Sequence, residues 1–151
     1  MSGTPWVRAA IAAALTVFLA LGADAAQRKK APERSVWEPS RMAPLTNDKG
    51  DPARGRIAVI KKGNCLACHI MPIPEEPDHG DVGPPLEGVG SRLTPAELRM
   101  RIVDPKVLNP DTIMPSFYKR DLNRVAKEWE GKTILDAQDV EDVVAYLSTL
   151  K

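Results

Sequence analysis

The run Cys65-Leu66-Ala67-Cys68-His69 constrains this chain more than any other part of its sequence, because it holds the only two cysteines. They lie three positions apart, so a disulfide between them would close a very small loop and tie no distant segments together. Two thiols and an adjacent imidazole are instead three groups able to hold a metal or a cofactor at one place in a fold.

Cys-X-X-Cys-His is the pattern by which haem is attached covalently to protein chains. The thiols of Cys65 and Cys68 add across the two vinyl groups of the porphyrin and form thioether bonds. His69 then stands beneath the iron and supplies an imidazole nitrogen as one axial ligand. The sequence therefore predicts one covalently bound haem c.

Two other kinds of site use the same residue types. A thioredoxin-like redox pair needs strands around its cysteines and has no use for the adjacent histidine. A zinc site needs four ligands, and the candidates here are Cys65, Cys68, His69 and His79. Two neighbours such as Cys68 and His69 make a poor pair of zinc ligands, so haem is the stronger interpretation.

Haem iron takes its second axial ligand from a limited set of side chains, methionine and histidine among them. Four candidates are disfavoured. Met71 and His79 follow the attachment run too closely to reach the other face of the haem. Met100 falls in a predicted helix, and Met42 falls in the N-terminal arm. Met114 lies in a proline-bounded loop that a whole helix separates from His69, which favours it, with His79 as the alternative. Ligation by His69 and Met114 would raise the reduction potential and leave no open position for a substrate.

The other ring nitrogen of a ligating histidine needs a hydrogen-bond acceptor that fixes the ring. Gly83-Pro84-Pro85-Leu86 is well placed to supply a backbone carbonyl, and that of Pro84 is expected to accept from Nδ1 of His69. Arg92 is either a partner of a haem propionate or an ordinary solvated charge.

Helix signals outnumber all others in the chain. Asp51-Pro52 begins a predicted helix toward Gly63, with an apolar face of Ala53, Ile57 and Ile60. Gly55 within it indicates the close approach of another element, because glycine in a helix costs about 1 kcal/mol relative to alanine. A second predicted helix starts at Thr94, with Pro95 and Glu97 as capping signals, and stops at Asp104-Pro105.

Two further helices are predicted nearer the C-terminus. Leu122, Val125, Ala126 and Trp129 share one face of a short helix that Gly131 ends. Asp136 caps the last helix, whose apolar stripe is Val140, Val143, Val144, Tyr146 and Leu147. Prolines make residues 70–85 and 109–118 loops, and no strand pattern is present. The predicted fold class is all-α, with short helices and proline-rich loops around one haem.

Residues 1–25 have the order of a secretory signal: Arg8, an apolar run, then small residues before a cleavage site near Ala25. The apolar run falls short of the roughly 20 residues that span a bilayer, so we expect export to the periplasm without membrane insertion. Residues 26–50 are predicted to be an extended arm, whose Gln27-Arg28-Lys29-Lys30 is either a basic docking patch or simply solvated. Residues 51–151 form the predicted haem domain.

The net charge of the chain is +1 and stays so without residues 1–25. A near-neutral chain lacks the basic face that nucleic acid requires. Few aromatic residues remain after the signal, so the core is thin, and a flat apolar cofactor in its middle would compensate. We expect the chain to fold poorly without haem.

The arrangement resembles class I cytochrome c, in which the first and last helices cross at a glycine and an aromatic residue, here Gly55 and Tyr146. It is similar in more detail to the SoxX family of sulfur-oxidation cytochromes over about residues 50–151. The segments that carry this resemblance are 63–69 (GNCLACH), 83–90 (GPPLEGVG), 109–118 (NPDTIMPSFY) and 137–147 (AQDVEDVVAYL). The arm matches nothing in that family.

The resemblance to SoxX implies a partner and a pathway. SoxX proteins pair with the haem protein SoxA in the periplasm, in a complex that joins thiosulfate to a cysteine of the carrier SoxYZ (L-cysteine S-thiosulfotransferase). The chemistry occurs at the haem of SoxA, and SoxX passes the released electrons to a downstream acceptor. His69 and Met114 would then hold a relay haem, and no residue of this chain would be catalytic.

Two alternatives share part of this evidence. A free-standing periplasmic cytochrome c that carries electrons to a terminal oxidase would use the same haem residues, and it would differ only in lacking a permanent partner. An exported thiol–disulfide oxidoreductase would keep Cys65 and Cys68 as free thiols that react with alkylating reagents.

Overall fold

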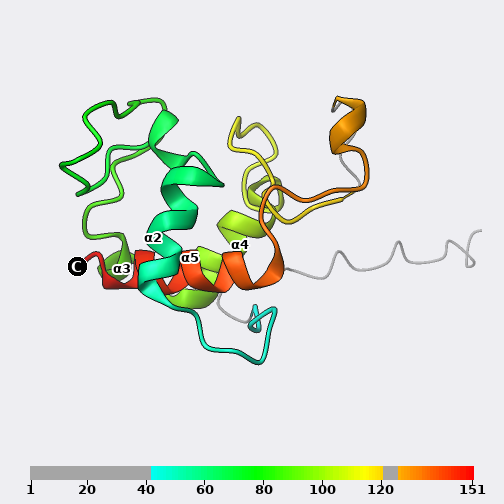
Figure 1. The fold of residues 1–151 in the computed structure, drawn as a ribbon, viewed down its shortest axis with the longest axis horizontal. Coiled ribbons are helices and arrows are strands. Elements are labelled where there is room, and N and C mark those ends of the chain that lie inside the picture. Colours follow the sequence, from blue (N-terminus) through cyan, green and yellow to red (C-terminus); the bar gives the residue numbers. More distant parts are fainter. Residues whose placement is uncertain (1–41, 121–125) are drawn as a thin grey trace, which may run out of the picture. The chain divides into compact units, whose positions relative to one another are not determined.

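Helices, short 3-10 turns and long loops make up the structure, a computed structural model that describes residues 42–120 and 126–151, all within the unit Trp37–Lys151. In chain order the elements are α2 (Pro52–Lys61), η3 (Cys65–Ala67), α3 (Val89–Arg92), α4 (Pro95–Val103), η4 (Pro105–Val107), η5 (Lys127–Trp129) and α5 (Ala137–Thr149) (Figure 1). The described part of the chain contains no strand, and the predicted all-α class is confirmed.

Some predictions fall outside the described residues. These are the signal peptide, residues 26–41 of the arm, and positions 121–125 at the start of the short helix that Gly131 was predicted to end. The rest of that helix is only the turn η5, followed by Gly131 with a φ of 69°. No helix among the described residues has the length and apolar character needed to cross a membrane.

α2 and α5 cross at Gly55 (Figure 1). A Cβ atom at this position would overlap the carbonyl oxygen of Asp142 and lie 2.9 Å from Cβ of Tyr146. Because only a residue without a side chain lets the two backbones come this close, the expected contact between Gly55 and Tyr146 is confirmed.

The same contact decides which side of α2 is buried. The prediction from the apolar pattern is confirmed for Ile60, which is partly buried against the core, and is wrong for the other two residues. Ala53 and Ile57 are exposed, Ile57 by 58%, although both were expected to face the core. The buried residues of α2 are Gly55, Ala58 and Val59. Positions three and four apart share one face of a helix, so the close approach at Gly55 turns Ala58 and Val59 toward α5 and overrides the apolar pattern.

Side-chain caps begin the three longer helices where the sequence predicts them. Asp51 accepts hydrogen bonds from two backbone N–H groups in the first turn of α2. Thr94 and Glu97 form a capping box at the start of α4, and Asp136 and Asp139 form another at the start of α5. Each cap satisfies N–H groups that have no partner within the helix.

An ion pair in the protein interior joins α4 to α5. Arg99 donates to both carboxylate oxygens of Glu141 at 2.6 Å, and each side chain is only 6% exposed. The same ion pair also binds residues that precede α2 in the sequence. Arg99 donates to the carbonyl of Met42 at 2.9 Å, and the N–H of Leu45 donates to Glu141 at 3.0 Å. The described end of the predicted arm is therefore bound to α4 and α5.

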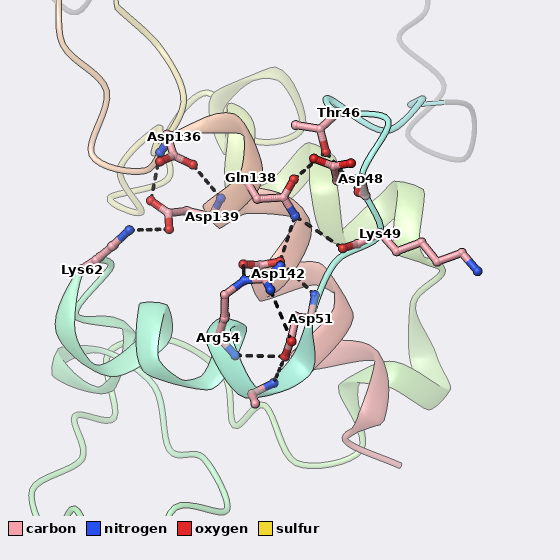
Figure 2. A network of polar contacts seen from close by, with 11 residues as sticks. Thr46, Asp48, Lys49, Asp51, Arg54, Lys62, Asp136, Gln138, Asp139 and Asp142 are labelled. Carbon is pink, nitrogen blue, oxygen red and sulfur yellow. Dashed lines mark hydrogen bonds and ion pairs between the residues drawn. The ribbon is translucent and has the colours of Figure 1, made fainter.

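A second buried carboxylate, Asp142, organises the network in Figure 2. It accepts hydrogen bonds from the N–H of Asp51 at 2.8 Å, from Arg54 at 2.6 and 2.8 Å, and from Gln138 at 2.9 Å. Burial alone would raise the pKa of Asp142, but these donors outweigh it and the pKa lies below its ordinary value. Thr46 donates to Gln138 at 2.9 Å, which adds a further contact between α5 and the chain ahead of α2.

We predict that Arg99→Met lowers the free energy of unfolding by about 3–5 kcal/mol, because it leaves the carboxylate of Glu141 buried without a partner. Urea unfolding of the holoprotein at neutral pH measures the change. Lys62→Met is a matched control, since it removes an ion pair to Asp139 from a half-exposed lysine. It should cost less than about 1 kcal/mol, and an equal cost in the two variants would contradict the assignment.

The same pair predicts a pH dependence. Burial raises the pKa of Glu141, but hydrogen bonds from Arg99 and from Leu45 N–H outweigh it, so the pKa lies below its ordinary value of 4.5. The pair therefore contributes stability above about pH 4.5 that is lost as the pH falls through the folded-state pKa. In Arg99→Met the unpaired carboxylate has a raised pKa because of its burial. The difference in stability between wild type and Arg99→Met should therefore begin to shrink above pH 4.5 and continue to shrink as the pH falls through the folded-state pKa of the pair.

Candidate haem site

A cavity of about 750 Å³ lies between the helices and the two long loops, and its wall is mostly apolar. This volume is within the roughly 300–1,000 Å³ typical of ligand and cofactor sites. Four residues that the sequence predicts to hold haem are all in its wall: Cys65, Cys68, His69 and Met114. The rest of the lining comes mainly from residues 105–117, from residues 82–86 and from α4, and α5 adds Val143 and Leu147.

The attachment run is folded into a tight turn. Asn64 adopts the left-handed conformation with φ of 46°, a region in which asparagine is enriched. η3 follows, and the N–H of His69 donates to the carbonyl of Cys65 at 3.0 Å. The N–H of Gly80 donates to the carbonyl of Leu66 at 2.8 Å and fastens the turn to the following loop. This fold presents both thiols and the imidazole to one cavity.

The imidazole of His69 is fixed by its neighbours. Its Nδ1–H donates to the carbonyl of Pro84 at 2.7 Å, which is the acceptor that the sequence predicts. The proton on Nδ1 leaves Nε2 with its lone pair free, the form in which imidazole binds a metal. Gly83 lies flat against the ring, because a Cβ there would overlap Cε1 and stand 2.6 Å from Nδ1. This role of Gly83 was not predicted from the sequence.

Met114 is the one candidate for the second axial ligand that lines the cavity. It is half-buried, and its N–H donates to the hydroxyl of Thr112 at 3.2 Å. Met71 and Met100 are buried in the core, 4% and 1% exposed, away from the cavity wall. Met42 and His79 are not in the wall either.

His79 is engaged elsewhere. Its Nδ1 accepts a hydrogen bond from the N–H of Met71 at 3.4 Å, and its Nε2 is buried with no hydrogen-bond partner among the described residues. The geometry therefore favours Met114 over His79.

The two alternative sites find little support. Both cysteines are free, and burial raises the pKa of the Cys65 thiol to about 11. A thiol that acts in disulfide exchange has a lowered pKa instead, because the thiolate is the nucleophile. Across residues 42–120 and 126–151, no group of three or more His, Cys, Asp or Glu side chains is arranged to hold a metal ion.

Arg92 lines the cavity, and its guanidinium forms hydrogen bonds to the loop that follows Pro84. It donates to the carbonyl of Glu87 at 2.7 Å and to that of Pro85 at 3.2 Å. These two carbonyls follow Pro84, the acceptor for His69, so Arg92 stabilises the backbone that fixes the imidazole. These contacts differ from both roles predicted for Arg92 from the sequence, a partner of a haem propionate and a solvated charge.

Three apolar side chains at the cavity were not identified from the sequence. Val82, Leu108 and Ile113 line it and are 62%, 36% and 78% exposed. Apolar surface of this size next to an apolar cavity fits a flat hydrophobic macrocycle, which would cover it. The thiols, the oriented imidazole and the apolar wall together fit a covalently bound haem.

Comparison with known proteins decides the family. Residues 53–151 match the Cytochrome c family. The chain belongs to the cytochrome c family. It carries covalently bound haem c, and Cys65 and Cys68 fit the attachment motif of these proteins.

This cytochrome is also similar to a chain in the crystal structure of SoxXA from P. pantotrophus. The two are 39% identical, with a TM-score of 0.66, over 72% of this chain and 88% of that chain. The predicted likeness to SoxX cytochromes is thereby confirmed. The comparison with curated protein sequences gives no match.

We predict that Cys65→Ala leaves at most one thioether bond to the haem and lowers the yield of holoprotein. Intact-mass measurement and a haem-stained denaturing gel follow the attachment. The matched control is Ala67→Ser, which changes an exposed side chain inside the same turn and should leave the yield unchanged. A normal yield of Cys65→Ala holoprotein would contradict the assignment of this thiol.

Proposed function

We propose that this cytochrome is the electron-transfer subunit of a periplasmic complex that oxidises thiosulfate, with a SoxA-type haem protein as its partner. The observation that carries the proposal is the 39% identity to a chain of SoxXA over 72% of this chain. The cavity adds support, because it gathers the attachment cysteines and two iron-ligand candidates in one wall.

In this proposal His69 and Met114 would be the two protein ligands that hold the iron. His69 would bind through Nε2, because its Nδ1–H is committed to Pro84. Met114 would bind through its thioether sulfur, from a segment that Pro110 and Pro115 stiffen. Bound haem supplies a one-electron carrier, and methionine ligation raises its potential.

Two protein ligands leave no open position on the iron for a substrate. The role of this chain is then to accept and release electrons, and none of its residues is catalytic. When thiosulfate is joined to a carrier thiol, the new S–S bond forms as the thiol proton and two electrons leave. A chain with one haem takes one electron at a time, so each thiosulfate requires two transfers through it.

We predict that Met114→Ala lowers the reduction potential and removes the weak long-wavelength absorption band that a methionine sulfur gives with ferric haem. The direction follows because methionine ligation raises the potential. Spectroelectrochemical titration of the holoprotein measures both. Met71→Leu is the matched control, a volume-conserving change at a buried methionine outside the cavity. An unchanged spectrum and potential in Met114→Ala would exclude Met114 as the ligand.

The partner is tested by isolating the tagged cytochrome from its native periplasmic extract and staining a denaturing gel for haem. A second, larger haem-bearing chain in constant ratio is the expected result. A single stained band at the mass of this chain would instead favour a free-standing carrier. The intact mass of the isolated chain also tests the predicted removal of residues 1–25.

A further inference from the structure

The loop that carries Met114 is attached to the end of α4, and Asp104 lies at the centre of the attachment. Asp104 ends α4, where its N–H donates to the carbonyl of Met100 at 3.0 Å. Its carboxylate accepts a hydrogen bond from the hydroxyl of Ser116 at 2.8 Å and from the ammonium of Lys119 at 2.9 Å. Ser116 is 2% exposed, and the side chain of Asp104 is 14% exposed.

Backbone hydrogen bonds extend this attachment. The N–H of Phe117 donates to the carbonyl of Ile102 at 3.0 Å, and the N–H of Tyr118 donates to that of Val103 at 3.4 Å. The chain after Ser116 therefore follows the last turn of α4. Only Pro115, whose ring fixes φ, separates Ser116 from Met114, so any displacement of Ser116 is passed to the methionine.

Within residues 42–120 and 126–151, the other side of Met114 has no hydrogen bond to a comparable buried charged group. The carbonyl of Thr112 accepts from the exposed Lys106 at 2.6 Å, and its hydroxyl accepts from the N–H of Met114 at 3.2 Å. Ile113 between them is 78% exposed. A charged acceptor such as Asp104 makes stronger hydrogen bonds than a neutral one, so the buried side determines how firmly the loop is held.

We propose that Asp104 is a positioning residue for Met114, whose carboxylate holds Ser116 and Lys119 and thereby keeps the methionine side of the haem closed. This inference rests on the proposed ligation by Met114. Asp104 itself is not among the residues that line the cavity. It acts through the loop, so its loss should make the methionine dissociate more often without removing the ligand.

The test is a titration of ferric holoprotein with imidazole, which binds the iron only when the methionine has left. Asp104→Asn keeps the shape of the side chain and removes its charge. The matched control is Asp111→Asn, which removes an exposed carboxylate from the same loop, three residues before Met114. The methionine absorption band and the reduction potential are recorded for each protein.

We expect Asp104→Asn to bind imidazole about ten- to a hundredfold more tightly than wild type, the range set by losing a charged hydrogen bond. The methionine band should weaken, and Asp111→Asn should stay within about twofold of wild type. Equal imidazole affinity in the two variants would overturn the role of Asp104 while leaving Met114 as the ligand.

Two further results are informative. If wild type lacks the methionine band, both the ligand assignment and the role of Asp104 fail. If Asp104→Asn yields no holoprotein, Ser116→Ala decides, because it removes one hydrogen bond and keeps the Lys119 ion pair. Ser116→Ala should then bind imidazole more tightly than Asp111→Asn, and an affinity equal to that of Asp111→Asn would overturn the inference.

Discussion

A cavity of about 750 Å³ lies among a small set of helices and loops, and their packing requires a group that fills it. Residues from α4, α5 and both long loops face it, so each element has part of its apolar surface directed toward the haem. Burial of apolar surface is the main favourable contribution to folding. The cofactor is therefore a structural component of the core as well as the carrier of electrons, and its covalent attachment keeps it there.

A close backbone contact and several polar contacts hold the helices and loops around that cavity. α2 and α5 cross without intervening side chains at Gly55, and Arg99 and Glu141 connect α4 to α5. The two loops that line the cavity are each held by a charged residue, the first by Arg92 and the second by Asp104. The protein thus fixes its candidate iron ligands through the backbone of proline-rich loops rather than through helices.

Local signals in the sequence predict much of this arrangement. The capping residues Thr94 and Asp136 mark helix starts because the capping bonds are made within one turn of the chain. The attachment run and the Pro84 carbonyl are likewise close in sequence to His69. The exposed face of α2 was not predictable from its apolar pattern, because the crossing with α5 sets the rotation of that helix. Arg99 and Glu141 are 42 positions apart in the sequence. Because only the tertiary fold brings them together, no local signal predicts their ion pair.

If haem completes the core of this cytochrome, the chain without haem should not unfold cooperatively. Urea unfolding, followed by far-ultraviolet circular dichroism, compares the holoprotein with a Cys65→Ser/Cys68→Ser chain that carries no haem. We expect a cooperative transition for the holoprotein and a broad, non-cooperative loss of helix for the haem-free chain. A cooperative transition in the haem-free chain, with a free energy of unfolding within about 1 kcal/mol of the holoprotein, would contradict this expectation.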